Sequence, residues 1–326
     1  MNLLAGTPIQ SARSAMAGVR FEGFAVLPSN ASVVEATLHL LEGSSSDLLI
    51  TGPSGWGKSR FLDVIAQLAS DRIGAEVRPQ LGVNFLSQSS YLTREPWLVL
   101  DQTEAMLTQP RFRQELRATL ELRTRLRKPT VLACTTQREN ESLLAAVLPK
   151  RGWRPHRIHE PQSEERQVIL RLMAEREGLR LSDRLITLLS RKLQGNGNSF
   201  LGALQRLNLV QPIWQEAADE LKAFGTLRLY MADAYGWDLR DHVDAVVHEF
   251  YHAQPYPKNS SLADSLSLYF MQRSFGISER EVAAYYGLSL GQAYAEFNRV
   301  DDLVRSDLAI WSQACLRTLA ISLENA

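Results

Sequence analysis

The sequence predicts an α/β fold with a mostly parallel sheet in its first half and a wholly helical second half. From Phe21 to about Glu160, short apolar runs alternate with stretches of helical spacing, which is typical of a parallel sheet covered by helices. From Gln162 onward, apolar residues recur only with helical spacing. A glycine-rich turn at residues 52–59 separates an apolar run from a helical pattern inside the sheet region.

Each expected element follows from one of these patterns. Short apolar segments predict the strands Leu48–Thr51, Val83–Leu86, Trp97–Asp101, Thr130–Thr135 and Arg157–His159. Amphipathic spacing predicts the helices Glu165–Glu177, Ser182–Gln194 and Phe200–Leu221, and then a last helical block, Asp238–Ala326. Glycines at 178, 195 and 197 separate the first three of these helices.

These elements suggest four parts in a chain of 326 residues, which has room for about two or three domains. We expect an N-terminal arm at 1–20, an α/β base at 21–160, an all-α region at 161–235 and a C-terminal helical domain at 236–326.

Composition is ordinary for a soluble globular protein, with 45% hydrophobic and 22% charged residues. No run approaches the roughly 18 apolar residues that a membrane helix needs, and the first residues lack the order of a secretory signal. Cys134 and Cys315 have no metal-type spacing, so we expect buried free thiols in a reducing compartment. The chain is therefore expected to be cytoplasmic, without a membrane partner.

The charge is unevenly distributed. Residues 236–326 contain 7 Lys or Arg and 12 Asp or Glu, a net charge of −5. Because the whole chain is neutral, the remaining residues carry +5.

The glycine-rich turn fits the phosphate-binding pattern G-x-x-x-x-G-K-[ST] in full. Its residues are Gly52, Pro53, Ser54, Gly55, Trp56, Gly57, Lys58 and Ser59. It follows an expected strand and precedes a helical pattern, which is the context that a P-loop requires. The glycines allow backbone N–H groups to approach phosphate oxygens, Lys58 is expected at the β- and γ-phosphates, and the Ser59 hydroxyl at Mg²⁺. The sequence therefore predicts binding of ATP or ADP with Mg²⁺.

The second half of this site is predicted at the strand Trp97–Asp101, which ends in a carboxylate about forty residues after Lys58. Asp101 is expected to hold Mg²⁺ through water, as a Walker B aspartate does. The next residue is Gln102, whose amide cannot accept a proton at neutral pH, and Glu104 is the nearest carboxylate. Thr135, at the end of the strand Thr130–Thr135, is expected to reach the γ-phosphate or the attacking water.

The order of these motifs resembles the AAA+ module of DnaA-type bacterial replication initiators and their relative Hda. The resemblance rests on residues 24–30, the P-loop, Asp101-Gln102, residues 160–170 and a lid-type helix at residues 202–207. It implies an AAA+ base, a helical lid and a C-terminal helix-turn-helix domain. It also implies that residues 24–28, with Phe24 and Val26, lie beside the adenine.

Departures from that family predict slow hydrolysis. AAA+ proteins usually carry an acidic residue where Gln102 stands, and the lid's sensor arginine falls on Asn198. Losing an arginine of this kind can cost on the order of 10³ in rate. The arginine finger, offered to a neighbouring AAA+ subunit, is expected at Lys150 or Arg151. The short segment between Val83 and Trp97 leaves no room for the initiator's filament-forming helices, a feature closer to Hda.

Residues 281–300 have the alanine and glycine spacing of a helix-turn-helix. The resemblance places a reading helix over Gln292–Val300, but the family's arginine-rich loop corresponds here to Pro255–Asn259 with a single lysine. Phosphate contacts supply most non-specific DNA affinity, so a domain at −5 is expected to bind duplex DNA weakly.

Two further patterns are open to more than one interpretation. One pattern is a basic helix whose opposite face is expected to bury Phe112, Leu116 and Leu120. Its seven basic residues form either a solvated face or a surface for DNA or an acidic partner. They are Arg111, Arg113, Arg117, Arg123, Arg125, Arg127 and Lys128.

The segment His248-Glu249-Phe250-Tyr251-His252 matches the H-E-x-x-H pattern of zinc proteases, but no third ligand follows at the usual spacing.

Three functions follow from these features. The first is a DnaA-related ATP-binding protein in replication initiation or its regulation, acting as a nucleotide-dependent binding switch with another AAA+ subunit or a replication protein as partner. The second is an active DNA-remodelling or transposition ATPase. The third is a zinc metallopeptidase.

Overall fold

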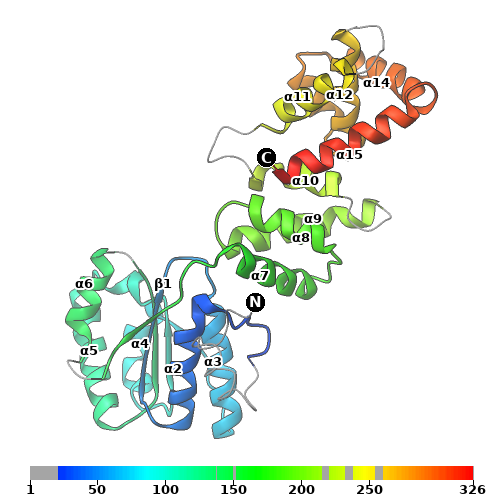
Figure 1. Ribbon diagram of the computed structural model, residues 1–326. Coiled ribbons are helices and arrows are strands. Elements are labelled where there is room, and N and C mark those ends of the chain that lie inside the picture. Colours follow the sequence, from blue (N-terminus) through cyan, green and yellow to red (C-terminus); the bar gives the residue numbers. More distant parts are fainter. Residues whose placement is uncertain are drawn as a thin grey trace. The chain divides into compact units, whose positions relative to one another are not determined.

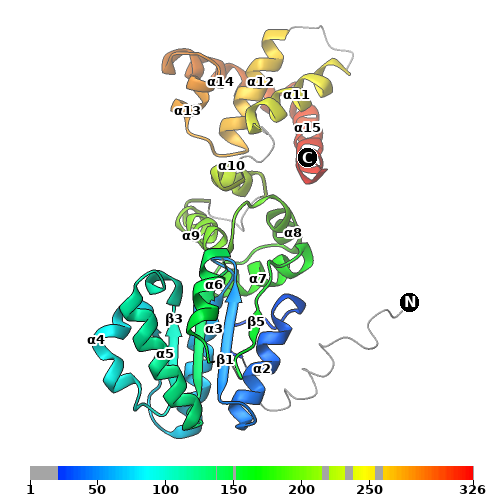
Figure 2. The same cartoon turned by 90° about the vertical axis from the view of Figure 1, so that its left-hand side faces the viewer.

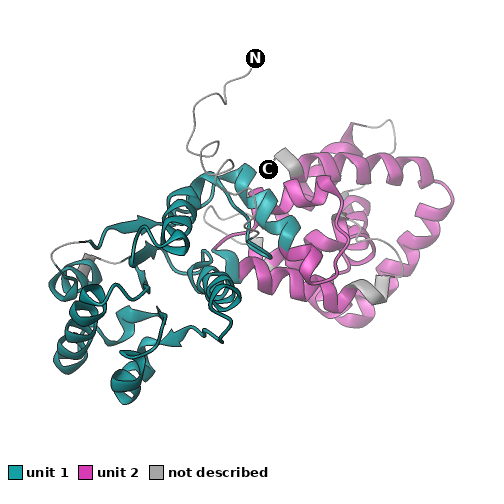
Figure 3. Ribbon diagram, turned by 90° about the horizontal axis from the view of Figure 1, so that it is seen from below, with its two compact units in different colours: residues 1–172, 196–198 teal, residues 173–195, 199–326 magenta. Residues whose placement is uncertain are grey.

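The computed structural model describes residues 21–136, 138–149, 152–214, 220–231, 238–253 and 260–325. It contains two compact units (Figure 3). Unit 1 comprises residues up to Leu172 together with Asn196–Asn198, and unit 2 comprises Met173–Gly195 and the residues from Ser199 onward. The N-terminal arm expected at 1–20 lies outside the described residues.

Unit 1 is built on a five-stranded parallel sheet in the order β2-β3-β4-β1-β5. The strands are β1 (Asp47–Gly52), β2 (Gln80–Leu81), β3 (Leu98–Asp101), β4 (Thr130–Thr135) and β5 (Pro155–Arg157). Figure 2 shows β1 between β3 and β5. From β1 the chain runs to β2 at one edge of the sheet, and from β4 it crosses β1 to reach β5 at the other edge. Ligands of open parallel sheets bind at the carboxyl ends of the strands where the strand order changes direction in this way.

Helices cover both faces of this sheet. In Figure 1, α2 (Ala31–Glu42) and α3 (Lys58–Ile73) lie on one side of β1, and α5 (Pro110–Arg125) and α6 (Arg138–Val147) lie on the other. The core beneath α4 (Gly82–Leu92) and α5 is apolar, with Phe85 and Phe112 edge to face at 5.6 Å between ring centroids. The predicted burial of Phe112, Leu116 and Leu120 is confirmed.

The predicted strand Val83–Leu86 was wrong, because these residues lie in helix α4. Only the two-residue strand β2 precedes that helix. Phe85 and Leu92, seven residues apart, are buried on one helical face, whereas Val83 is 51% exposed. A short run of apolar residues cannot separate these alternatives by periodicity. The last strand also lies two residues earlier than predicted, at Pro155–Arg157.

The second half of the chain is helical, as predicted. It contains α7 (Ser163–Arg176), α8 (Asp183–Lys192), α9 (Gly197–Trp214), α10 (Glu220–Met231), α11 (Leu239–His252), α12 (Ser260–Arg273), α13 (Glu279–Tyr285), α14 (Leu290–Arg305) and α15 (Ala309–Asn325). The single helix predicted over Phe200–Leu221 corresponds to α9 and the start of α10. Ser182 caps α8 by accepting a hydrogen bond from the Leu185 N–H at 3.1 Å.

Helix α10 is tightly packed within unit 2. A Cβ atom on Gly225 would lie only 2.0 Å from the Phe275 carbonyl oxygen, so this helix approaches the α12–α13 connection at backbone distance. Arg228, one turn later, forms an ion pair with Glu281 at the start of α13. Helix α10 thus packs against the connection from α12 to α13 and against the start of α13.

Both cysteines are buried free thiols, as predicted. Burial raises the pKa of Cys315 to about 12, which keeps this thiol protonated and unreactive. No helix among the described residues is long and apolar enough to cross a membrane.

Candidate nucleotide site

The P-loop lies between β1 and α3, at the carboxyl end of β1. Its backbone can be formed only by glycine at two positions. A Cβ on Gly52 would meet the Ile158 carbonyl oxygen at 2.4 Å, and one on Gly55 (φ 79°) would meet the Asn196 side chain at 2.2 Å. The loop is thereby held between the end of the sheet and residue 196, and it leads into the N-terminus of a helix of 16 residues. Such a terminus offers free N–H groups to an anion.

Lys58 is the first residue of α3, and its side chain is almost fully buried. Its Nζ donates hydrogen bonds to the Gly52 carbonyl at 3.0 Å and the Pro53 carbonyl at 2.8 Å. Burial lowers the pKa of Lys58, while the negative charges of Glu104 and then Asp101 act in the opposite direction. The ammonium group is therefore held inside the loop, beside two carboxylates.

Asp101 ends β3 and is buried, whereas Gln102 is exposed. Asp101 Oδ1 accepts a hydrogen bond from the Gln102 N–H at 2.8 Å. Gln102 has a φ of 50°, in the left-handed region that non-glycine residues rarely adopt. The chain thus turns sharply after Asp101 and enters the 3₁₀ helix η2 (Thr103–Met106).

The turn brings a residue without a predicted role into the site. Glu104 is the strongest negative influence on Lys58, ahead of Asp101. Its Oε2 atom is buried and has no hydrogen-bond partner among the described residues. Sequence reasoning identified Glu104 as the nearest carboxylate, but a distance along the chain could not show that the turn at Gln102 directs it toward Lys58.

The predicted catalytic residue Thr135 lies at the end of β4, in register with Gly52 of β1. The next residue, Thr136, continues this pairing, because its N–H donates to the Gly52 carbonyl at 3.0 Å. Thr136 Oγ1 is buried and has no hydrogen-bond partner in the described part of the chain. The structure thus places both threonines beside the P-loop, with a donor still available on Thr136.

The segment predicted to lie beside the adenine is fixed next to the P-loop. The Phe24 ring packs on Phe61 of α3 at 4.7 Å between centroids, and a Cβ on Gly57 would touch it at 3.3 Å. Phe24 and Val26 are both partly exposed, so an apolar surface remains open at this position.

A buried carboxylate secures this segment. Glu165, at the start of α7, accepts hydrogen bonds from the Ser29 N–H and the Gln162 N–H, both at 2.8 Å. The His159 N–H donates to the Ser29 carbonyl at 2.8 Å, which ties the same segment to the chain leaving β5. Glu165 is a positioning residue that the sequence pattern alone did not reveal.

Asn196, two residues before the sensor position Asn198, contacts the P-loop. Asn196 Nδ2 donates to the Ser54 carbonyl at 3.3 Å, and its Oδ1 accepts from the Asn198 N–H at 3.0 Å. The Asn198 side chain is exposed. Lys150 and Arg151, the predicted finger candidates, lie outside the described residues.

The remaining P-loop residues also have defined surroundings. The Trp56 side chain is buried, and the Arg166 guanidinium lies 5.5 Å from its ring centroid. Ser59 is exposed.

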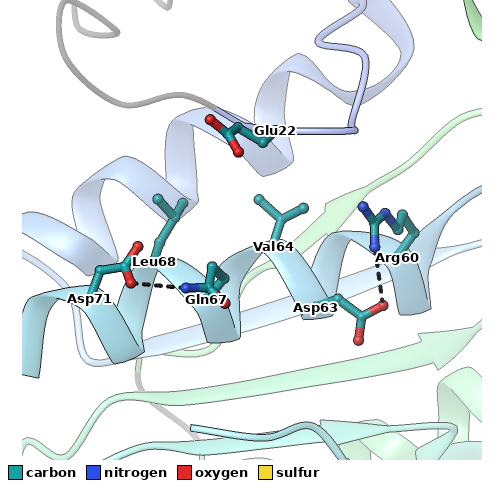
Figure 4. A pocket seen from close by; sticks show the side chains of 7 residues that line it. All are labelled: Glu22, Arg60, Asp63, Val64, Gln67, Leu68 and Asp71. Carbon is teal, nitrogen blue, oxygen red and sulfur yellow. Dashed lines mark hydrogen bonds and ion pairs between the residues drawn. The ribbon is translucent and has the colours of Figure 1, made fainter. Parts of the chain in front are cut away.

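A separate pocket of about 650 Å³ lies along the outer face of α3 (Figure 4). It is lined by Glu22, Arg60, Asp63, Val64, Gln67, Leu68 and Asp71. None of these residues belongs to the P-loop, and two of its side-chain pairs, Arg60 with Asp63 and Gln67 with Asp71, already contact each other. The pocket is therefore distinct from the nucleotide site.

The H-E-x-x-H segment lies on α11 within the C-terminal helices. His248 Nε2 contacts Asp264 Oδ1 at 2.9 Å, and Tyr251 is buried against Trp311. In the described ranges, no group of three or more His, Cys, Asp or Glu side chains is arranged to hold a metal ion. Within the described residues, the metallopeptidase hypothesis therefore has no zinc site to support it.

Arg123 does not belong to the basic surface predicted for α5. It is fully buried and donates hydrogen bonds to the carbonyls of Glu95 at 2.8 Å and Pro129 at 2.7 Å and to Thr130 Oγ1 at 2.9 Å. Arg127 and Lys128 lie beyond the end of α5 at Arg125. The prediction of one continuous basic face was wrong at these positions, because helical spacing alone cannot show which arginine binds backbone carbonyls.

In the C-terminal region, α13 and α14 are joined by the short turn at residues 286–289. Ser289 caps α14 in a capping box with Gln292. Glu296 accepts hydrogen bonds from Arg299 at 2.6 Å and Ser265 at 2.9 Å, and Arg299 also donates to Ser265 at 3.0 Å. The basic residue of the expected reading helix is therefore bound within the domain.

The structure thus combines a five-stranded parallel sheet, a P-loop at the carboxyl end of β1 and a helical second half. Neither a family model nor a curated protein matches the sequence. Among solved structures, domain III of the replication initiation protein DnaA from Thermotoga maritima is similar, with a TM-score of 0.57 and 19% identity over 65% of this chain and 97% of that chain. A DNA replication initiation factor is similar with a TM-score of 0.51 and 16% identity over 94% of this chain and 98% of that chain. The chain thus has a DnaA-like AAA+ fold, which confirms the fold implied by the sequence resemblance.

Proposed function

We propose that this chain is a DnaA-related AAA+ protein that binds ATP and ADP and acts in the initiation of DNA replication or its regulation. The observation that carries the proposal is the position of Lys58, which is buried inside a complete P-loop at the carboxyl end of β1, beside Asp101. In a DnaA-like AAA+ fold this is the place where a nucleotide triphosphate binds.

The residues present fit a magnesium nucleotide. Backbone N–H groups of the P-loop and the start of α3 face the position of the phosphates, Lys58 supplies a cation, and Ser59 and Asp101 supply oxygen ligands of the kind Mg²⁺ prefers. Bound Mg²⁺ would neutralise phosphate charge. Phe24 and Val26 would line the base, because Phe24 already packs against α3 next to Gly57.

Slow hydrolysis is part of the proposal. Gln102 has a neutral amide in place of the usual acid, and Asn198 supplies no cation. A site that binds nucleotide firmly and hydrolyses it slowly suits a switch, whose conformation reports whether ATP or ADP is bound. Another AAA+ subunit or a replication protein would respond to this conformation.

We further propose that the C-terminal helices bind a protein partner more readily than duplex DNA. Residues 236–326 carry −5, and Arg299 is held by Glu296 and Ser265. Leu290 and Tyr294, one turn apart on α14, are 54% and 56% exposed. Such a surface offers few phosphate contacts and some apolar area. The two buried free thiols support a cytoplasmic location.

Calorimetric titration of the full chain with ATP and ADP tests the proposed function. Lys58→Ala should weaken both nucleotides at least about tenfold, because a charge-assisted phosphate contact is worth roughly 1.5–3 kcal/mol. Lys128→Ala, at the opposite end of the strands, is the matched control and should bind like the wild type. Unchanged affinity in Lys58→Ala, with the fold verified by circular dichroism, would rule out this site.

A further inference from the structure

The turn after β3 is anchored from two sides. Thr103 is fully buried, and its Oγ1 donates to the Ala133 carbonyl of β4 at 2.9 Å. Gly82, the first residue of α4, approaches from the other side: a Cβ there would lie 2.9 Å from the Gln102 carbonyl oxygen and 3.2 Å from Thr103 Cα. The left-handed conformation of Gln102 is therefore set by packing, and the residues after it point in a fixed direction.

This direction carries Glu104 back toward the P-loop. Its negative charge acts on Lys58 more strongly than that of Asp101, and it also acts on the Cys134 thiol near the end of β4. Burial and then Glu104 raise the pKa of Cys134 to about 11, so the thiol stays a neutral neighbour. Glu104 thus lies among β3, β4 and the P-loop lysine, where the γ-phosphate end of a nucleotide is expected.

One oxygen of this carboxylate has no hydrogen-bond partner in the part of the chain that the structure describes. Glu104 Oε2 is buried, and no donor among the described residues reaches it. A buried acceptor left without a hydrogen bond destabilises the folded protein, and such an atom is rarely retained without a role. Thr136 Oγ1, at the end of β4, is a second buried polar atom without a partner in the described residues. Both atoms could bind a water molecule or a phosphate oxygen brought by the nucleotide.

Gln102, which stands where AAA+ proteins usually carry an acid, differs from Glu104 in both chemistry and position. Its side chain is exposed, and an amide does not accept a proton. The carboxylate of this chain is therefore that of Glu104, two residues after Gln102. The left-handed turn at Gln102 directs it back toward the P-loop.

We propose that Glu104 is the catalytic carboxylate of this protein, which orients the attacking water and accepts its proton. The inference rests on the proposed nucleotide binding. The water oxygen forms a bond to the γ-phosphorus, and the bond from that phosphorus to the β,γ-bridging oxygen breaks, with its electron pair remaining on ADP. The proton released by the water passes to the Glu104 carboxylate and from there to solvent, so that ATP and water yield ADP, inorganic phosphate and a proton.

Single-turnover hydrolysis of γ-labelled ATP by the full chain tests this role. Glu104→Gln keeps the size and hydrogen-bonding shape but cannot accept the proton, so the rate should fall at least about 100-fold, which is the usual lower contribution of a general base. ATP affinity, measured by calorimetry, should stay within about threefold of the wild type. Glu115→Gln, at an exposed position on α5, is the matched control, and its single-turnover rate should remain within about threefold of the wild-type rate.

Three results would overturn the assignment of Glu104 while leaving nucleotide binding in place. The Glu104→Gln variant could hydrolyse ATP at the wild-type rate, or it could lose ATP affinity as strongly as rate, which would indicate that Glu104 only positions Lys58. The wild type could also bind ATP without any turnover in a single-turnover experiment. If the wild type binds neither ATP nor ADP, the proposed function itself fails.

Discussion

At the scale of single residues, Arg123 shows how much a side chain's environment can differ from its sequence pattern. It lies in an arginine-rich helix, yet it is fully buried and ties the loop before β3 to the loop before β4 through backbone carbonyls. Burial lowers its pKa to about 10, so it remains protonated at neutral pH. Its charge is satisfied by carbonyl dipoles rather than by a carboxylate partner at hydrogen-bond distance.

Replacing Arg123 should destabilise unit 1 more than any exposed arginine would. Arg123→Ala leaves several buried carbonyls without donors and a cavity in the core, so we expect a loss of about 3–5 kcal/mol in the free energy of unfolding. Urea unfolding followed by circular dichroism measures it. Arg125→Ala, at an exposed position two residues later, should change stability by less than about 0.5 kcal/mol. A loss below about 1 kcal/mol in Arg123→Ala would contradict the buried-network role.

The lowered pKa values of two buried histidines predict how the free energy of unfolding depends on pH. Burial lowers the pKa of His156 in β5, and burial followed by the charge of Lys192 lowers that of His242 in α11. A group with a lowered folded-state pKa binds more protons in the unfolded state, so stability is highest above the unfolded pKa of about 6.5 and falls as pH drops toward the folded value.

Urea midpoints measured from pH 7.5 down to pH 5.0 should therefore decrease. His242→Gln and His156→Gln should each flatten part of this decrease, because glutamine does not titrate. Midpoints that rise as the pH falls, or slopes that are the same in all variants, would contradict this assignment.

At the scale of secondary-structure elements, the close approach of α10 to the α12–α13 connection is the feature most sensitive to a single methyl group. Alanine is a better helix former than glycine by about 1 kcal/mol. At Gly225, however, the new Cβ would lie 2.0 Å from the Phe275 carbonyl oxygen, so α10 would have to shift. At residue 225 the steric overlap of a Cβ atom therefore outweighs the higher helix propensity of alanine.

We expect Gly225→Ala to destabilise unit 2 by about 1–3 kcal/mol, the usual cost of overpacking. Gly291→Ala in α14 is the matched control, because a Cβ there would meet no other segment of the described chain within 4 Å, and its stability should be unchanged or slightly higher. Thermal unfolding of both variants distinguishes these outcomes. Equal melting temperatures for the two would show that the Gly225 contact is not maintained in solution.

At the scale of the whole molecule, the charge distribution predicts the affinity of the chain for duplex DNA and its dependence on salt. With −5 on residues 236–326 and Arg299 engaged by Glu296, few phosphates should be neutralised by the C-terminal helices. Each phosphate contact contributes roughly −0.9 to the slope of log affinity against log salt. We therefore expect weak duplex binding with a shallow slope, unaltered in Arg299→Ala.

Fluorescence anisotropy of the full chain with labelled duplex at graded salt concentrations measures both quantities. Charge reversal by Glu296→Lys, which would release Arg299, is the informative comparison and should steepen the slope. Sub-micromolar wild-type binding with a steep slope that Arg299→Ala abolishes would show that α14 is a functional DNA-reading helix.

The sequence alone determined the parts of this protein that depend on local chemistry. The P-loop, the strand ending in Asp101 and the helical second half follow from glycine spacing and from periodicities of two and 3.6 residues, which are visible along the chain. The DnaA-like AAA+ fold could be predicted because these motifs occur in a characteristic order.

Only the tertiary structure decided which side chains meet. The apolar run at Val83 became helix α4 because Phe85 and Leu92 bury one helical face against α5. Asn196 contacts the P-loop, and the left-handed turn at Gln102 turns the chain so that Glu104 acts on Lys58. These outcomes depend on packing between segments far apart in the chain, which local propensity does not contain.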